Sequence, residues 1–114
     1  MNEAARKYRE LVIARVLKGP GEATPVARQA AFDNRGVDPR ASALVGKIAR
    51  QAWTVTGQDV ATTKAAGVTE DEIFELAVAA ALGQASRQFD AAMAALDAAT
   101  QPDAAASDKV GHPR

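Results

Sequence analysis

The chain has 114 residues, no cysteine and a formal net charge of zero, and 47% of its residues are hydrophobic. The length suits one domain, and the missing thiols exclude disulfides, thiolate catalysis and metal sites with cysteine ligands. Because 28 residues are alanine and five are aromatic, we expect a helical protein with a thin core that is supplemented by burial against other subunits.

Charge is divided unevenly between the two halves of the sequence. Residues 1–50 carry ten Lys and Arg against five Asp and Glu, whereas residues 51–114 carry four against nine. This polarity suits docking of one half on the other, within or between chains, better than binding a polyanion. The sequence has no apolar run long enough for a membrane span and no signal-peptide core, so we expect a cytoplasmic protein with no membrane partner.

The first predicted helix covers residues 3–17. Tyr8, Val12 and Val16 are spaced four positions apart, which is typical of a helix. The stretch LVIARVL also fits a buried strand, but strong helix formers precede it. The KGPG segment that follows cannot continue a helix.

Two further helices are predicted by a capping residue followed by proline. Thr24 and Pro25 predict a helix that reaches about Phe32, and Asp38 and Pro39 predict a third helix. The buried stripe expected on the third helix consists of Leu44, Val45, Ile48 and, at its end, Trp53. The β-branched residues and the glycine in the WTVTG segment then predict a bend or a break.

The strongest local signal follows Gly67, where a fourth helix is expected to end. Thr69 and Glu72 form a predicted capping box, and Val68 and Ile73 occupy the hydrophobic-staple positions. The helix that begins there is expected to run to Ala98, with a kink or a close helix contact at Gly83. Its expected buried stripe consists of Ile73, Ala77, Ala80, Ala81, Ala85, Phe89, Met93 and Leu96.

These signals predict an all-α protein of about five helices. We expect one helical domain over residues 1–99 and a disordered tail over residues 100–114. The only histidine, His112, lies in that tail, so neither a Ser-His nucleophile nor a histidine metal site is expected in the folded part. We expect no cofactor and no metal.

A helix-turn-helix DNA-binding protein is an alternative, because residues 61–76 have the rhythm of helix, glycine turn and helix. The second of these helices, however, opens with Glu70, Asp71, Glu72 and Glu75. Four carboxylates would repel phosphates, so nucleic acid is not the expected partner.

Four stretches follow one another between Asp38 and Leu96, over about half of the chain: DPRASALV, AAGVTEDEI, FELAVAAAL and SRQFDAAMAAL. In this order they resemble the carboxymuconolactone decarboxylase and alkylhydroperoxidase-D superfamily. The resemblance implies an AhpD-like helical bundle that assembles with itself as a homotrimer or homohexamer.

In the redox members of this superfamily, the bend holds a Cys-x-x-Cys pair followed by a histidine, which lies eight residues before the glycine of the turn. Counting back from Gly67 puts Asp59 at the histidine position, and Val55 and Ala52 at the two cysteine positions. The glutamate of the family falls at Arg40 or, in a second alignment, at Ala43. Because peroxidase and disulfide-reductase chemistry needs a thiolate, we expect no such activity.

Decarboxylase-like members use no cysteine pair, and polar and basic groups surround the lactone carboxylate. The resemblance then implies Asp59 as a candidate general base, with Arg50, Trp53, Thr56, Gln58 and Arg87 as candidate ligands of a small organic acid. The alternative is an exposed or ion-paired Asp59, a core Trp53 and arginines on solvated faces. We therefore expect either a binding or scaffold protein or a non-redox, decarboxylase-like enzyme.

Overall fold

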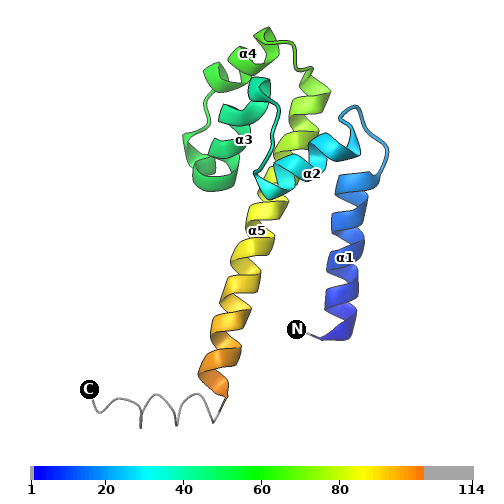
Figure 1. Cartoon of the computed structure of the whole chain (residues 1–114), viewed down its shortest axis with the longest axis vertical. Coiled ribbons are helices and arrows are strands. Elements are labelled where there is room, and N and C mark those ends of the chain that lie inside the picture. Colours follow the sequence, from blue (N-terminus) through cyan, green and yellow to red (C-terminus); the bar gives the residue numbers. More distant parts are fainter. Residues whose placement is uncertain (1, 102–114) are drawn as a thin grey trace, which may run out of the picture. The chain divides into compact units, whose positions relative to one another are not determined.

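The computed structural model describes residues 2–101, and these residues form five α-helices, one 3-10 turn and no strand (Figure 1). The helical elements are α1 (Glu3–Lys18), α2 (Pro25–Asp33), α3 (Pro39–Gln51), the 3-10 turn η1 (Ala52–Thr54), α4 (Gly57–Ala65) and α5 (Glu70–Thr100). The predicted all-α class is therefore confirmed. The strand alternative for the LVIARVL stretch is wrong, because this stretch lies inside α1.

The chain divides into two compact units, Met1–Gln84 and Ala85–Arg114, with the boundary inside α5. The first unit contains α1 to α4 and the first half of α5, and the second unit contains the rest of α5. The predicted tail was placed from residue 100, but α5 includes Thr100. The remainder of that predicted tail, including His112, lies outside the described residues.

Short side chains cap the helices of the first unit at the positions that the sequence indicated. Thr24 Oγ1 accepts a hydrogen bond from the Ala27 amide at 3.0 Å, and Asp38 Oδ1 accepts one from the Arg40 amide at 2.8 Å. A proline occupies the first turn of both α2 and α3, where its missing N–H costs nothing. Local chemistry therefore fixes both helix starts.

The turn between α4 and α5 has the predicted capping box. The Glu72 amide donates to Thr69 Oγ1 at 3.2 Å, and the Thr69 amide donates to Glu72 Oε1 at 2.9 Å. Val68 and Ile73 are both buried and pack with Leu44 of α3. Gly67 has a φ of +107°, a conformation that favours glycine. This turn therefore joins α4, α5 and α3 around one small core.

The main core of the first unit is built mostly from alanine. Its buried members are Leu17, Ala23, Ala31, Ala41, Val45, Leu76, Ala79 and Ala80. Val45 is the largest side chain that is almost completely buried. Small side chains allow close helix contacts but contribute little apolar area, so this core is thin, as the composition indicated.

The two predicted buried stripes need correction, and the inner face of α1 was not predicted. Trp53 was placed on the buried stripe of α3, but it is 82% exposed, because α3 ends at Gln51 and the 3-10 turn rotates the following side chain away from the core.

On α5, Leu76 and Ala79 are buried, whereas Ala81 is exposed. In the second unit, Ala85, Phe89 and Leu96 of α5 are exposed. On α1, the buried residue is Leu17, and Tyr8, Leu11 and Val12 are exposed.

None of the helices between residues 2 and 101 combines the length and the hydropathy that crossing a bilayer requires.

Candidate functional site

The predicted bend is a real interruption between α3 and α4. The helical hydrogen bonds of α3 stop at Gln51, the chain makes one 3-10 turn, and Val55 is extended. The Val55 amide donates to the Ala52 carbonyl oxygen at 3.2 Å. Ala52 is exposed, whereas Val55 is partly buried and packs against the core cluster of Leu44, Val68 and Ile73.

Asp59 caps the start of α4 together with Thr56. The Thr56 amide donates to Asp59 Oδ2 at 2.9 Å, and the Asp59 amide donates to Thr56 Oγ1 at 3.2 Å. This is a second capping box, which the sequence reasoning missed because it treated Thr56 as a candidate ligand and Asp59 as a candidate general base. The same carboxylate oxygen also accepts a hydrogen bond from Lys47 Nζ of α3 at 2.9 Å.

These contacts oppose the use of Asp59 as a base. The Lys47 ammonium and the Thr56 amide hold the pKa of the Asp59 carboxyl below its ordinary value. A general base works best with a pKa near the operating pH, so a carboxylate with a lowered pKa is a weak proton acceptor. Of the two alternatives for Asp59, the structure supports the ion-paired one, and the catalytic role stays a prediction without geometric support.

The other candidate ligands are spread over separate elements. Arg50 is exposed at the end of α3, and Trp53 is exposed on η1. Gln58 donates from Nε2 to Thr62 Oγ1 within α4, at 3.1 Å. Arg87 belongs to the second unit. Among the six predicted residues, Thr56 and Asp59 are joined by hydrogen bonds, and these bonds cap α4.

We expect replacement of Thr56 by alanine to lower the free energy of unfolding by about 1 kcal/mol, because the Asp59 amide loses its side-chain acceptor. Urea unfolding followed by circular dichroism measures this change. Thr56→Ser is the matched control, since serine keeps the hydroxyl, and its stability should stay close to that of the wild type. Equal losses in both variants would contradict the capping role.

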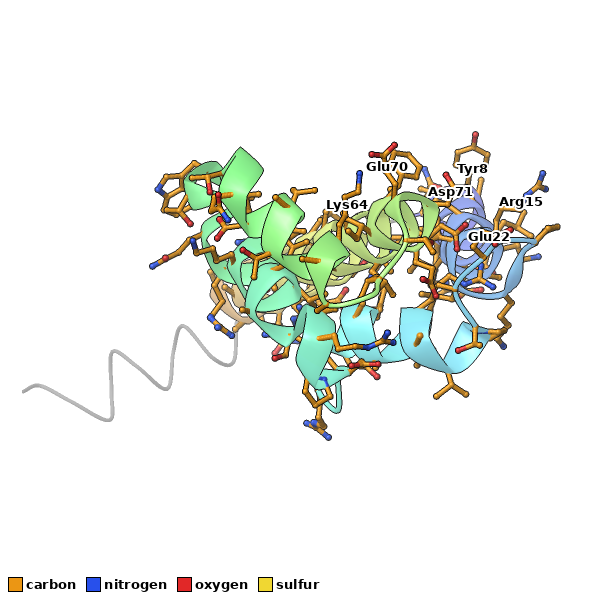
Figure 2. All side chains as sticks on the ribbon, turned by 90° about the horizontal axis from the view of Figure 1, so that it is seen from above. Tyr8, Arg15, Glu22, Lys64, Glu70 and Asp71 are labelled. Atoms are coloured by element: carbon orange, nitrogen blue, oxygen red, sulfur yellow. The ribbon has the colours of Figure 1, made fainter. Side chains whose placement is uncertain are left out.

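A cavity that the sequence reasoning did not predict lies where α1, the loop after it, α2 and the start of α5 meet. Its volume is about 230 Å³. The lining residues are Arg15, Val16, Gly19, Pro20, Arg28, Phe74, Glu75 and Val78, all within the first unit. In Figure 2, Arg15 projects outward from α1, and Glu22 lies in the adjoining loop. The walls are mainly apolar, and three ionisable side chains interrupt them.

Arg28 is the unusual residue of this cavity, because it is a charged side chain that is only 4% exposed. Its Nη1 donates to the Val16 carbonyl oxygen at 3.1 Å. Its Nε is shielded from solvent and has no hydrogen-bond partner. Burying a charged group with an unused donor costs free energy, so such a group needs a physical explanation.

Glu75 holds the loop between α1 and α2 on α5. Its two carboxylate oxygens accept hydrogen bonds from the Glu22 amide at 2.8 Å and the Ala23 amide at 2.7 Å. The Glu22 amide lowers the pKa of the Glu75 carboxyl, and the Ala23 amide and the Arg28 charge act in the same direction, against the effect of burial. Glu75 is therefore ionised near neutral pH, and its main contacts are with backbone.

One sequence signal could have revealed Arg28. On the predicted helix that begins at Pro25, Arg28 is three residues before Ala31, so it lies on the face that packs inward. An arginine at a core-facing position is uncommon unless a partner compensates its charge. The loop geometry that brings Glu75 nearby involves residues more than fifty positions apart, and no local pattern encodes it.

No protein-family model, curated protein or solved structure matches the chain. Among residues 2–101, no group of three or more His, Asp or Glu side chains is arranged to hold a metal ion. The functional argument therefore depends on the geometry of the interruption at η1 and of the Arg28 cavity.

Proposed function

We propose that this chain is a cysteine-free protein of the carboxymuconolactone decarboxylase-like superfamily, and that it acts as a homo-oligomeric binding or scaffold protein without thiol redox chemistry. The observation that carries the proposal is the 3-10 interruption at η1, with Trp53 exposed on it. The sequence resemblance puts the reactive dithiol of redox relatives at positions 52 and 55, which are the first residue of η1 and the residue directly after it.

A binding or scaffold role has more support than an enzymatic one. The candidate base Asp59 is engaged by Lys47 and by the Thr56 amide, so neither Asp59 nor the Thr56 amide is available to a ligand. A decarboxylase-like reaction would need a different base. The DNA-binding alternative gains nothing from the geometry, because Glu70 and Asp71 are exposed at the start of α5, where they would face phosphates.

Self-association is supported by the apolar surface of the first unit. Outside the lining of the Arg28 cavity, its exposed large hydrophobic residues include Tyr8, Leu11, Val26 and Trp53. They occur on a unit whose buried core is largely alanine, so covering them against a second copy would add the apolar burial that the monomer lacks. Trp53 is the largest of these side chains and the only tryptophan of the chain.

Light scattering coupled to size exclusion tests the proposal, and we expect a trimer or a hexamer at micromolar concentration. Trp53→Glu should shift the mass toward the monomer, because it places a charge in an apolar interface, whereas Trp53→Phe should retain the oligomer. On dilution, the fluorescence of Trp53 should move to longer wavelength as the ring becomes exposed. A wild-type protein that is monomeric throughout would refute the proposal.

A further inference from the structure

We propose that the cavity between α1 and α5 binds a small carboxylate that carries an apolar group, and that Arg28 recognises the carboxylate. This inference gives the proposed binding function a location and a ligand class, and it rests on that function. The location differs from the η1 region, where the sequence resemblance placed a candidate site.

The first argument is the state of the Arg28 guanidinium. One nitrogen, Nη1, is used by the Val16 carbonyl, while Nε has neither a protein acceptor nor contact with solvent. Arginine binds carboxylates with two parallel N–H bonds along one edge of its planar fork. Nε is closed to solvent, so an anion in the cavity would meet the part of the guanidinium that lines the cavity. The charge of the anion would add to that of Glu75 in compensating the buried arginine.

The second argument is the charge around the cavity. Arg15 and Arg28 contribute two positive charges to the lining, and Glu75 contributes one negative charge. The oxygens of Glu75 already accept the Glu22 and Ala23 amides, which stabilise its negative charge. The lining residues therefore carry one more positive charge than negative charge. This net charge favours a ligand with a single negative charge over a neutral molecule or a dianion.

The third argument is the size and the chemistry of the walls. Val16, Phe74 and Val78 give the cavity an apolar side, and its volume of about 230 Å³ exceeds the ~150 Å³ that accommodates benzene in a protein interior. Phe74 is 69% exposed at the mouth, where its ring can pack on an entering apolar group. A monocarboxylate with one ring fits these limits, whereas a nucleotide does not.

The test uses the full-length protein, labelled with ¹⁵N, and sodium benzoate as the probe at constant ionic strength. We expect saturable shifts of the backbone amides of Val16, Gly19, Phe74 and Glu75. Benzamide has the same ring and no charge, and it should bind at least about tenfold more weakly, the effect of losing one charge-assisted interaction. Equal binding of benzoate and benzamide would overturn the proposal, as would the absence of saturable shifts.

Two variants locate the site. Val78→Phe fills the cavity from a partly exposed position and leaves the arginine in the sequence, and it should weaken benzoate binding at least about tenfold. Val12→Phe makes the same change on α1 outside the lining, and its affinity should stay within about twofold of the wild type. Unchanged binding in Val78→Phe would place the ligand elsewhere and refute the assignment.

Arg28→Gln tests the recognition of charge directly, and its amide spectrum reports whether the variant folds. In the folded variant, the preference for benzoate over benzamide should disappear, and a retained preference would argue against Arg28. If the variant does not fold, the Val78→Phe and benzamide results decide the question. The cavity is formed by one chain, so the two proposals can fail separately. A monomeric protein that binds benzoate would contradict the proposed self-association and leave the ligand site standing. An oligomeric protein that does not bind benzoate would contradict the ligand site and leave the self-association standing.

Discussion

Replacement of Gly83 by alanine is expected to lower the free energy of unfolding by about 3 kcal/mol. A Cβ atom at this position of α5 would overlap the carbonyl oxygen of Phe32, and it would lie 2.7 Å from the carbonyl carbon. Neither backbone can move away cheaply, because Gly83 is in the middle of a helix and Phe32 is near the end of α2. The cost of separating them exceeds the ~1 kcal/mol that alanine gains over glycine as a helix former.

Gly57→Ala is the matched control for this prediction. Gly57 begins α4, and a Cβ atom there would meet nothing within 4 Å. The same substitution should therefore be neutral or stabilise the protein by up to about 1 kcal/mol. Urea unfolding of both variants measures the difference. If Gly83→Ala were as stable as Gly57→Ala, the close contact between α2 and α5 would be wrong.

The sequence predicted those features of the fold that depend on neighbouring residues. Thr24 with Pro25, Asp38 with Pro39, and Thr69 with Glu72 mark helix starts through hydrogen bonds that span two or three positions. Gly83 was expected to allow a kink or a close helix contact, and the contact is confirmed. Such signals are short-range, so they are readable without knowledge of the tertiary structure.

Burial was less predictable, because it depends on how the helices pack. Trp53 lies four residues after Ala49, which is a helical spacing, yet the 3-10 turn at the end of α3 changes its direction and exposes it. On α1, the apolar residues surround most of the helix, and tertiary contacts alone decide that Leu17 is buried and Leu11 is exposed. Periodicity identifies a helix, whereas the choice of its inner face requires the neighbouring elements.

The candidate site was predicted only in part. The interruption at η1 follows from the WTVTG sequence, but the function of Asp59 as a cap was overlooked, although a threonine three residues before a carboxylate is a recognisable capping pattern. The Arg28 cavity depends on contacts between α1, α2 and α5. No local motif could reveal that Glu75 meets the amides of Glu22 and Ala23.

Those contacts make Glu75 the second position where we expect a large loss of stability. Glu75→Ala should lower the free energy of unfolding by about 3 kcal/mol, because two backbone amides lose a charged acceptor. The Ala23 amide is partly buried, and the buried Arg28 also loses the negative charge that acts on it. Urea unfolding at neutral pH measures the loss.

Glu70→Ala is the control for this change, since it removes a glutamate from the same helix. Glu70 pairs with Lys64 at 3.0 Å, but its side chain is 79% exposed, so the pair is worth less than about 1 kcal/mol. Figure 2 shows this pair at the start of α5. Similar losses in the two variants would contradict the anchoring role of Glu75.

The pH dependence provides an independent test of the same contacts. The pKa of Glu75 is lowered in the folded protein relative to its ordinary value of 4.5, so the folded state favours the ionised form. The stabilisation is then fully present above the pKa of the unfolded state, and it is lost as the pH falls through the lower folded pKa. The stability gap between the wild type and Glu75→Ala should therefore narrow below pH 4.5, while remaining constant above it. A gap that stayed unchanged at acidic pH would mean that apolar packing, and not the carboxylate, holds the loop on α5.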